Sequence, residues 1–245
     1  MSHSQTSRGE ELVQANRRFY DSLWSQARLV NPNRFNTWPL VKGLLGRSRR
    51  RLEVAPGLRP RLPIAGTQFI DISVPALRRL RDAGGKVAMA AVTSLPLPSE
   101  SFDLVCALDI VEHVEDDQSA WSEITRVARS GSIVLLSTPL HPEQWTPFDD
   151  FVGHHRRYQP QELLARVEQH GLTIEQSAVY GMQPKSSRLL DLGMWWLTHR
   201  REEAMRWYNR IWMPLALRFE KKLSLIPGLI DFKTADEILL VCRKR

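Results

Sequence analysis

Apolar residues in this chain come as short runs, separated by segments that are polar or amphipathic. Three of these segments carry apolar residues at the spacing of one helix face, and glycine follows each of them closely. The predicted strands are 51–54, 67–73, 87–91, 104–108, 132–138, 173–180 and 237–242, and the predicted helices are 74–83, 116–129 and 161–170. Strands that alternate with helices predict an α/β fold around a mostly parallel sheet.

The chain before the first predicted strand follows another pattern. Residues 1–8 are polar and rich in serine, so we expect them to be disordered. Apolar residues at mixed helical spacings predict a helix over 10–29 and a second over 35–45. We therefore expect an N-terminal helical cap at 1–50 and a main domain at 51–245. The main domain contains a helical insertion at about 182–230, since this interval is too long for a simple crossover.

The stretch from Phe102 to Asp116 organises the predicted fold. The apolar run from Leu104 to Leu108 meets the carboxylate of Asp109, and a charged segment follows. A strand, an acid and a turn into a helix are typical of the edge of an open α/β sheet where ligands bind. With the preceding Leu95-Pro96-Leu97-Pro98-Ser99-Glu100-Ser101, this stretch resembles class I S-adenosylmethionine-dependent methyltransferases, in the type 11-like group that acts on small molecules and lipids.

The resemblance implies a Rossmann-like sheet of seven strands whose last strand is antiparallel, with N-terminal helices and the helical insertion before that last strand. It also implies S-adenosylmethionine as the cofactor and a small-molecule methyl acceptor. The resemblance covers about 51–180 and resumes at Glu237, so the insertion lies outside it.

The segment after the first strand departs from the family pattern of an acid followed by three spaced glycines. Glu53 and Gly57 match the acid and the middle glycine, but Ala55 and Arg59 replace the outer two. Prolines at 56, 60 and 63 and the short interval to the second strand leave no room for a full first crossover helix. Either this helix is reduced to a turn, or the site is remodelled.

The resemblance also assigns cofactor contacts along the sheet edge. Glu53 should face the methionine amino group through water, beside the turn at Ala55 and Gly57. An acid after the second strand suits the ribose hydroxyls, and the family's acid after the third strand is replaced by Ala91, so backbone near that strand should hold the adenine. An aromatic at Tyr20 could lie across the sulfonium, or simply pack. The predicted cofactor residues are Tyr20, Glu53, Ala55, Gly57, Asp71, Ile72, Val92, Thr93, Asp109 and Ile110.

Methyl transfer from a sulfonium needs mainly alignment and exclusion of water. A hydroxyl or amine acceptor also needs a base, and His154 or His155 is the best-placed candidate, in a segment that borders the acceptor pocket of the resembled family. The alternative is that these histidines and His113 serve as caps and loop hydrogen-bond partners. The sequence contains no Gly-x-Ser-x-Gly motif and no cluster of metal ligands, so we expect neither a covalent nucleophile nor a metal.

The insertion carries four tryptophans, at 195, 196, 207 and 212, interleaved with arginine. This pattern suits a membrane surface, a lid over an amphipathic or lipid-linked acceptor, or a helical subdomain packed on the sheet. Lys and Arg number 34 against 27 Asp and Glu, for a net charge of +7. That balance is compatible with nucleic acid, an anionic membrane or acidic substrates. Because no nucleic-acid recognition motif is present, we do not expect nucleic acid as a partner.

The expected compartment is the cytoplasm. Cys106 and Cys242 are the two cysteines, and both lie in apolar strand-like runs, which favours buried free thiols in a reducing compartment. Residues 1–11 lack the apolar centre of a secretory signal. No stretch approaches the roughly 20 apolar residues of a membrane span.

Two other functions remain open from the sequence. The replaced glycines would also suit a non-catalytic binding protein on a methyltransferase scaffold that has lost its cofactor site. An acid after the second strand is equally typical of nucleoside or NAD enzymes, although the signature from Leu95 to Glu115 argues against NAD.

Overall fold

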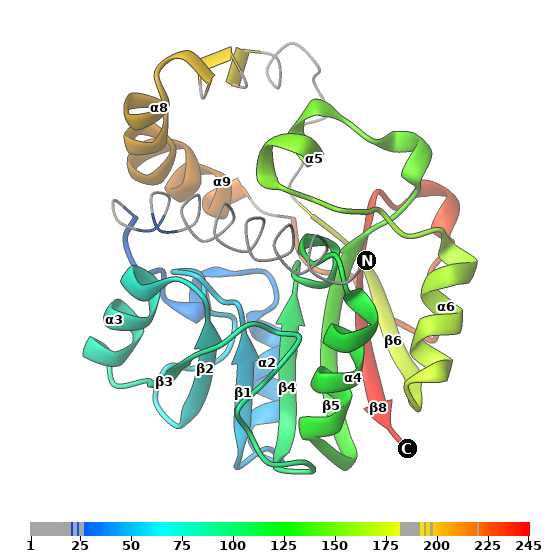
Figure 1. The fold of residues 1–245 in the computed structure, drawn as a ribbon. Helices are drawn as coiled ribbons and strands as arrows, with labels where there is room; N and C mark the ends of the chain where they lie inside the picture. Colours follow the sequence, from blue (N-terminus) through cyan, green and yellow to red (C-terminus); the bar gives the residue numbers. More distant parts are fainter. Residues whose placement is uncertain are drawn as a thin grey trace, which may run out of the picture.

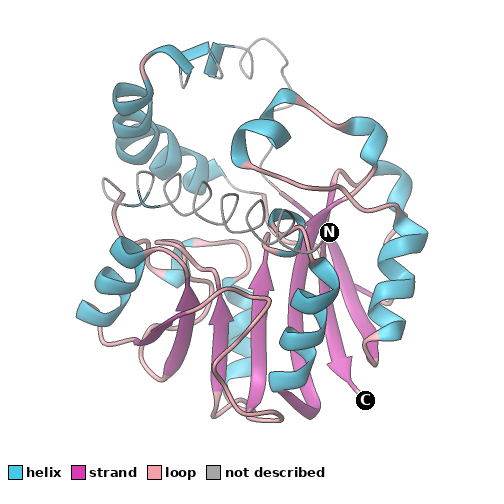
Figure 2. Ribbon diagram, in the orientation of Figure 1, coloured by secondary structure: helices cyan, strands magenta, loops and turns pink. Residues whose placement is uncertain are grey.

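The computed structural model describes residues 21, 24, 27–181, 192, 193, 195, 196, 198–219 and 221–245. Within these residues the chain forms one eight-stranded sheet with helices on both of its faces (Figure 1, Figure 2). The predictions of a disordered start at 1–8 and of a cofactor contact at Tyr20 lie outside the described residues.

The sheet has the strand order β3-β2-β1-β4-β5-β8-β6-β7. Strands β1 to β5 pair in parallel, whereas β8 is antiparallel to both of its neighbours, β5 and β6. The antiparallel last strand is therefore confirmed. The strands are β1 (Arg51–Val54), β2 (Thr67–Asp71), β3 (Lys86–Met89), β4 (Phe102–Leu108), β5 (Ala128–Pro139), β6 (Leu172–Tyr180), β7 (Ile226–Pro227) and β8 (Glu237–Lys244).

The predicted count of seven strands is corrected by β7. This two-residue strand pairs antiparallel with Gln176 and Ser177 at the edge of β6. It lies within the interval of about 182–230 where we expected a helical insertion. Ser177 donates its hydroxyl to the carbonyl of Gly228 at 2.7 Å and accepts the N–H of Ile230 at 2.8 Å, so these contacts bind the end of the insertion to the sheet edge.

The three helices predicted between strands begin and end within about two residues of the predicted positions. The three predicted between strands are α3 (Val74–Asp82), α4 (Asp117–Val127) and α6 (Pro160–Gln169); the others are α2 (Trp38–Leu45), α5 (Pro147–Val152), α8 (Arg201–Trp207) and α9 (Met213–Phe219). A π-helical segment (Tyr208–Trp212) joins α8 to α9. Among the described residues, no helix has the length and apolar character that crossing a membrane requires.

The connection from β1 to β2 contains no helix. Residues 55–66, all of them described, form turns and irregular backbone, as the prolines predicted. Leu58 and Leu62 are fully buried, so the loop is packed against the core rather than projecting from it.

The core lies on both faces of the sheet because successive strand side chains point to opposite faces. In β4, Val105 and Ala107 join the cluster that includes Trp121 of α4, whereas Leu104 and Cys106 join the cluster that includes Val41 of α2. Figure 1 shows α4 and α2 on opposite faces. Cys106 and its fellow cysteine at 242 are buried and free, as predicted.

Candidate functional site

The turn after β1 has the left-handed backbone of a glycine-rich loop at two positions. Ala55 and Gly57 both have φ +54°. A non-glycine residue pays for this conformation with steric strain of about 1 kcal/mol, so the backbone path is retained although the first glycine is replaced. The N–H of Gly57 donates to the carboxylate of Asp71 at 2.9 Å, which joins the turn to the end of β2.

Aromatic residues cover this turn. A Cβ added at Gly57 would overlap the ring of Trp24, so the tryptophan packs directly on the glycine. Arg59, which replaces the third glycine, lies 5.2 Å from the ring centre of Trp24 and 5.2 Å from that of Tyr208. Cation–π contacts of this kind link the turn to both the N-terminal segment and the insertion.

Glu53 is buried and holds the loop between β1 and β2. Its two carboxyl oxygens accept the N–H groups of Arg61 at 2.7 Å and Leu62 at 2.9 Å. Burial raises the pKa of Glu53 to about 7, although these two hydrogen bonds and the charge of Arg61 oppose the rise. The expected contact with a methionine amino group stays a prediction, because the described contacts of this side chain are to its own loop.

Asp71 closes the second strand and is also buried. It accepts the N–H of Gly57 and, at 2.8 Å, the N–H of Ser73. Burial raises the pKa of Asp71 to about 6, against the effect of these hydrogen bonds. Ser73 stands at the N-cap of α3, but its side chain bonds no helix N–H; its hydroxyl donates to Asp21 at 2.8 Å instead.

The predicted adenine and sulfonium residues lie along the same edge. Val92 is buried and Thr93 is half-buried, in the loop that follows β3. The N–H of Ala90 donates to the backbone oxygen of Asp71 at 3.2 Å, which holds this loop against the end of β2. Val92 belongs to the hydrophobic cluster on one face of the sheet, and Ile110 packs against that cluster; their role at the cofactor stays a prediction. Ile72 is half-buried in the turn after β2.

Asp109 lies at the centre of a group of acids that the sequence did not reveal. It is exposed, has φ +52°, and its carboxylate contacts the hydroxyl of Ser137. A hydrogen bond joins it to Glu237, the first residue of β8, and the charge of Glu112 is also close. Burial, reinforced by the Asp109 charge, raises the pKa of both glutamates well above the ordinary value.

Only the three-dimensional register could have identified Glu237 as a site residue. It lies opposite Pro139 of β5 and Tyr180 of β6, which places it at the edge where β4 also ends. The phenol of Tyr180 accepts hydrogen bonds from the guanidinium of Arg61 at 3.0 and 3.2 Å. A chain of charged and polar groups therefore runs across the strand ends, from the β1 loop to β8.

Of the two predicted bases, His154 has the more constrained ring. Its Nδ1 lies 2.8 Å from a carboxylate oxygen of Asp149, and Arg157 binds the same carboxylate with N–O distances of 2.8 and 3.1 Å. Burial would raise the pKa of Asp149, but hydrogen bonds from His154, Arg157 and Thr146 hold it well below the ordinary value. An ionised Asp149 accepts a hydrogen bond from a protonated Nδ1, so in the neutral imidazole the lone pair is on Nε2.

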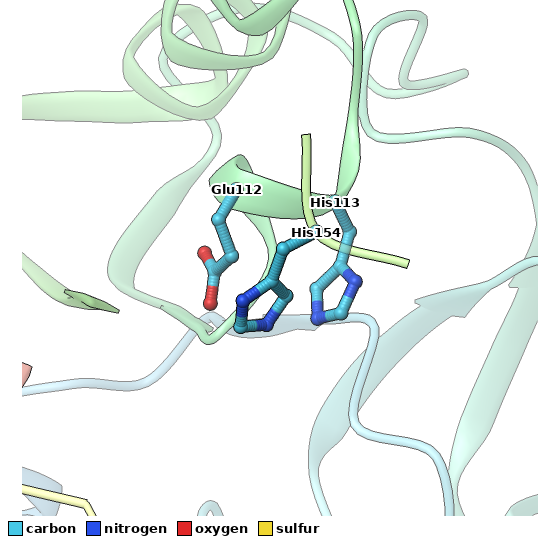
Figure 3. A group of neighbouring side chains, drawn as sticks. All are labelled: Glu112, His113 and His154. Carbon is cyan, nitrogen blue, oxygen red and sulfur yellow. The ribbon is translucent and has the colours of Figure 1, made fainter. Parts of the chain in front are cut away.

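Figure 3 shows His154 beside Glu112 and His113. The ring centres of the two histidines are 4.6 Å apart at an interplanar angle of 74°. The backbone N–H of His155 donates to the carbonyl of Glu112 at 2.7 Å, which joins the loop that carries His154 to the segment that carries Glu112 and His113. Burial, with the Arg156 charge, lowers the pKa of His155. The structure thus brings His154 to two potential metal ligands that are adjacent in sequence, Glu112 and His113, and the expectation of no metal stays untested.

Comparison with known proteins agrees with this architecture. Residues 61–136, from the loop before β2 into β5, match the methyltransferase domain family. Over 88 residues the chain is 35% identical to a probable S-adenosylmethionine-dependent methyltransferase of Mycolicibacterium smegmatis, and the aligned region covers 34% of this chain and 34% of the relative. Over 84 residues it is 33% identical to one from Mycobacterium tuberculosis, covering 33% of this chain and 30% of the relative. The chain therefore spans about a third of the length of the curated relatives it matches.

Solved structures share the fold at low identity. A methyltransferase of Thermotoga maritima, described as a possible histamine N-methyltransferase, has a TM-score of 0.56 at 14% identity and covers 98% of this chain and 96% of its own. The [4+2]-cyclase SpnF has a TM-score of 0.52 at 18% identity, and the match covers 84% of this chain and 80% of SpnF. The chain has the class I methyltransferase fold, and a scaffold that also serves a cyclase does not by itself fix the reaction.

Proposed function

We propose that this protein is an S-adenosylmethionine-dependent methyltransferase. The chain has the class I methyltransferase fold, and its residues 61–136 match the methyltransferase domain family. The observation that carries the proposal is the turn after β1. It keeps left-handed backbone at Ala55 and Gly57, and Asp71 holds it against the end of β2. A bound cofactor needs this close backbone approach beside an acid.

Each sheet-edge residue has a role in this proposal. The ribose hydroxyls bind to Asp71 beside Ile72, and the adenine binds at Val92 and Thr93. The methionine end binds at the turn of Ala55 and Gly57 near Glu53, which requires the Trp24 ring to move off Gly57, and Asp109 and Ile110 lie on the sulfonium side. The support is that these residues occupy the adjacent ends of β1, β2, β3 and β4.

His154 is the candidate base for an acceptor hydroxyl or amine. Its Nδ1 is paired with Asp149, so Nε2 is the nitrogen that can take a proton. In this proposal His155 supports the loop through its backbone N–H to Glu112 and takes no proton from the acceptor.

The insertion supports an amphipathic acceptor. Trp207, Ile211 and Trp212 are 49%, 44% and 54% exposed, and Arg206 and Arg210 lie among them. Arg206, Trp207, Arg210 and Ile211, together with Glu203, line a groove of about 450 Å³. In Figure 1, α8 and α9 lie on the side of the sheet toward which the parallel strands point. An apolar surface among cations suits an acceptor with a lipid-like part and an anionic group.

Isothermal titration with S-adenosylhomocysteine tests the cofactor. We expect binding by the wild-type protein and a loss of at least tenfold in affinity for Asp71→Asn, because a charge-assisted hydrogen bond contributes about 1.5–3 kcal/mol. Asp82→Asn removes the same charge from an exposed position at the end of α3 and should bind as the wild type does. Absence of binding with both S-adenosylmethionine and its demethylated product would refute the proposal, and binding of NAD instead would favour the dinucleotide alternative.

Flotation with anionic vesicles tests the acceptor class. Trp212→Glu should reduce the fraction of protein that floats with phosphatidylglycerol vesicles. Met89→Glu changes a side chain of similar exposure, 55%, on β3 and should leave flotation unchanged. If the wild-type protein stays with the sedimented fraction at low salt, the insertion is better explained as a lid.

A further inference from the structure

We propose that Glu112, His113 and His154 form a binding site for one divalent transition-metal cation. One potential ligand atom from each residue lies within 4.8 Å of the others. Figure 3 shows the three side chains gathered beneath the short 3₁₀ helix Val111–His113, which carries Glu112 and His113. Bonds of about 2.0–2.2 Å to imidazole and carboxylate would require these atoms to move closer by only a small amount.

The strongest sign of a ligand is an unpartnered oxygen. Glu112 is 1% exposed, and its Oε2 has no hydrogen-bond partner among the described residues. Buried polar atoms are almost always satisfied, and an orphan acceptor costs free energy. A cation bound between Glu112 and the two imidazoles would satisfy that oxygen.

The surroundings orient the ligands as in known metal sites. His154 is hydrogen-bonded through Nδ1 to Asp149, whose carboxylate Arg157 holds in turn. Hydrogen bonds to the backbone at Val152 and Gly153 hold the ring of His113. Histidine ligands commonly direct their second ring nitrogen to a carboxylate or a carbonyl in this way, which fixes the tautomer and the ring plane.

The donor set selects the class of cation. Two imidazoles and one carboxylate suit zinc, manganese, cobalt or iron(II), whereas magnesium and calcium prefer all-oxygen ligands. Three protein ligands leave at least one position open for water or an acceptor oxygen.

A catalytic consequence rests on the proposed function. The site follows β4, at the edge where the methyl group would be transferred, so a cation there could hold an acceptor oxygen and lower the pKa of its hydroxyl. In that state His154 is a ligand and cannot serve as the base. The base role of His154 then belongs only to the protein without the cation.

The test measures binding rather than activity. Full-length protein is dialysed against EDTA and then titrated with Zn²⁺, Mn²⁺ and Co²⁺ by calorimetry, and Co²⁺ binding is followed by its visible absorption. We expect one cation per chain, and at least a hundredfold weaker binding in Glu112→Gln and His154→Ala. Glu115→Gln and His199→Ala remove matched groups at exposed positions and should bind as the wild type does.

Failure to bind any of the three cations would overturn the site, as would equal affinity in the wild type, Glu112→Gln and His154→Ala. If Glu112→Gln does not fold, as judged by circular dichroism, His154→Ala alone decides the outcome. S-adenosylhomocysteine is titrated into the same samples. Cation binding without cofactor binding would reject the proposed function and keep the site, whereas cofactor binding without cation binding would reject only the site.

Discussion

The unfolding free energy should depend on pH through Glu53, in a direction opposite to that of most acids. Its pKa rises from 4.5 to about 7 because the folded chain buries it, and the N–H groups of Arg61 and Leu62 only partly offset this. Between those pH values the folded chain keeps the proton that the unfolded chain releases. The contribution of Glu53 to stability is therefore full below pH 4.5 and is lost as the pH rises to about 7.

The magnitude follows from the proton affinities. Each pKa unit corresponds to about 1.4 kcal/mol, so the rise from 4.5 in the unfolded chain to about 7 in the folded chain corresponds to about 3 kcal/mol of unfolding free energy. Glu53→Gln removes this titration, and the amide oxygen can still accept one of the two N–H groups. The variant should therefore gain about 3 kcal/mol relative to the wild type between pH 4.5 and pH 8.

Urea unfolding followed by tryptophan fluorescence at several pH values measures this difference. Other buried acids titrate in both proteins, so their contributions cancel when the two free energies of unfolding are subtracted. A difference that stays constant with pH would refute the reasoning. A difference that moves in favour of the wild type would show that the two hydrogen bonds outweigh burial and keep the carboxylate ionised.

Three further substitutions test individual contacts. Ala55→Gly should raise the unfolding free energy by about 1 kcal/mol and the melting temperature by a few degrees, since glycine adopts φ +54° without strain; a lower melting temperature would contradict this. Tyr158→Phe removes the hydroxyl that accepts the buried Trp121 N–H at 3.3 Å and donates to Asp117 at 2.7 Å, and should cost about 1–3 kcal/mol in urea unfolding, whereas an unchanged midpoint would mean that the two bonds together contribute nothing net. Arg157→Met leaves Asp149 as a buried charge without its main partner and should cost about 3–5 kcal/mol by the same assay; a gain in stability would show that the ion pair does not offset its desolvation.

The sequence predicted the sheet well because the signals for it are local. Apolar runs of the right length and glycines after the helices determined the element order, and the prolines between 56 and 63 correctly excluded a helix before β2. The antiparallel last strand came from the family resemblance rather than from any local pattern. The two-residue β7 was missed because so short a strand leaves almost no pattern of its own.

The site was predicted less completely because its contacts join distant segments. Glu112 and His113 stood inside the best-recognised stretch, but nothing local shows that residues 153–155 return to bury them. Glu237 was read only as the start of a strand, although its register beside Tyr180 makes it a partner of Asp109. The packing of Trp24 on the glycine turn likewise depends on tertiary structure.

The position of β8 has a consequence for synthesis on the ribosome. This strand is late in the sequence and yet lies between β5 and β6, with pairing along both of its edges. Until residues 237–244 leave the exit tunnel, β5 and β6 cannot be joined, and each exposes an unpaired edge to other nascent chains. The sheet therefore reaches its final order only after nearly all of this sequence has been translated, and a chaperone would have the most to protect during that interval.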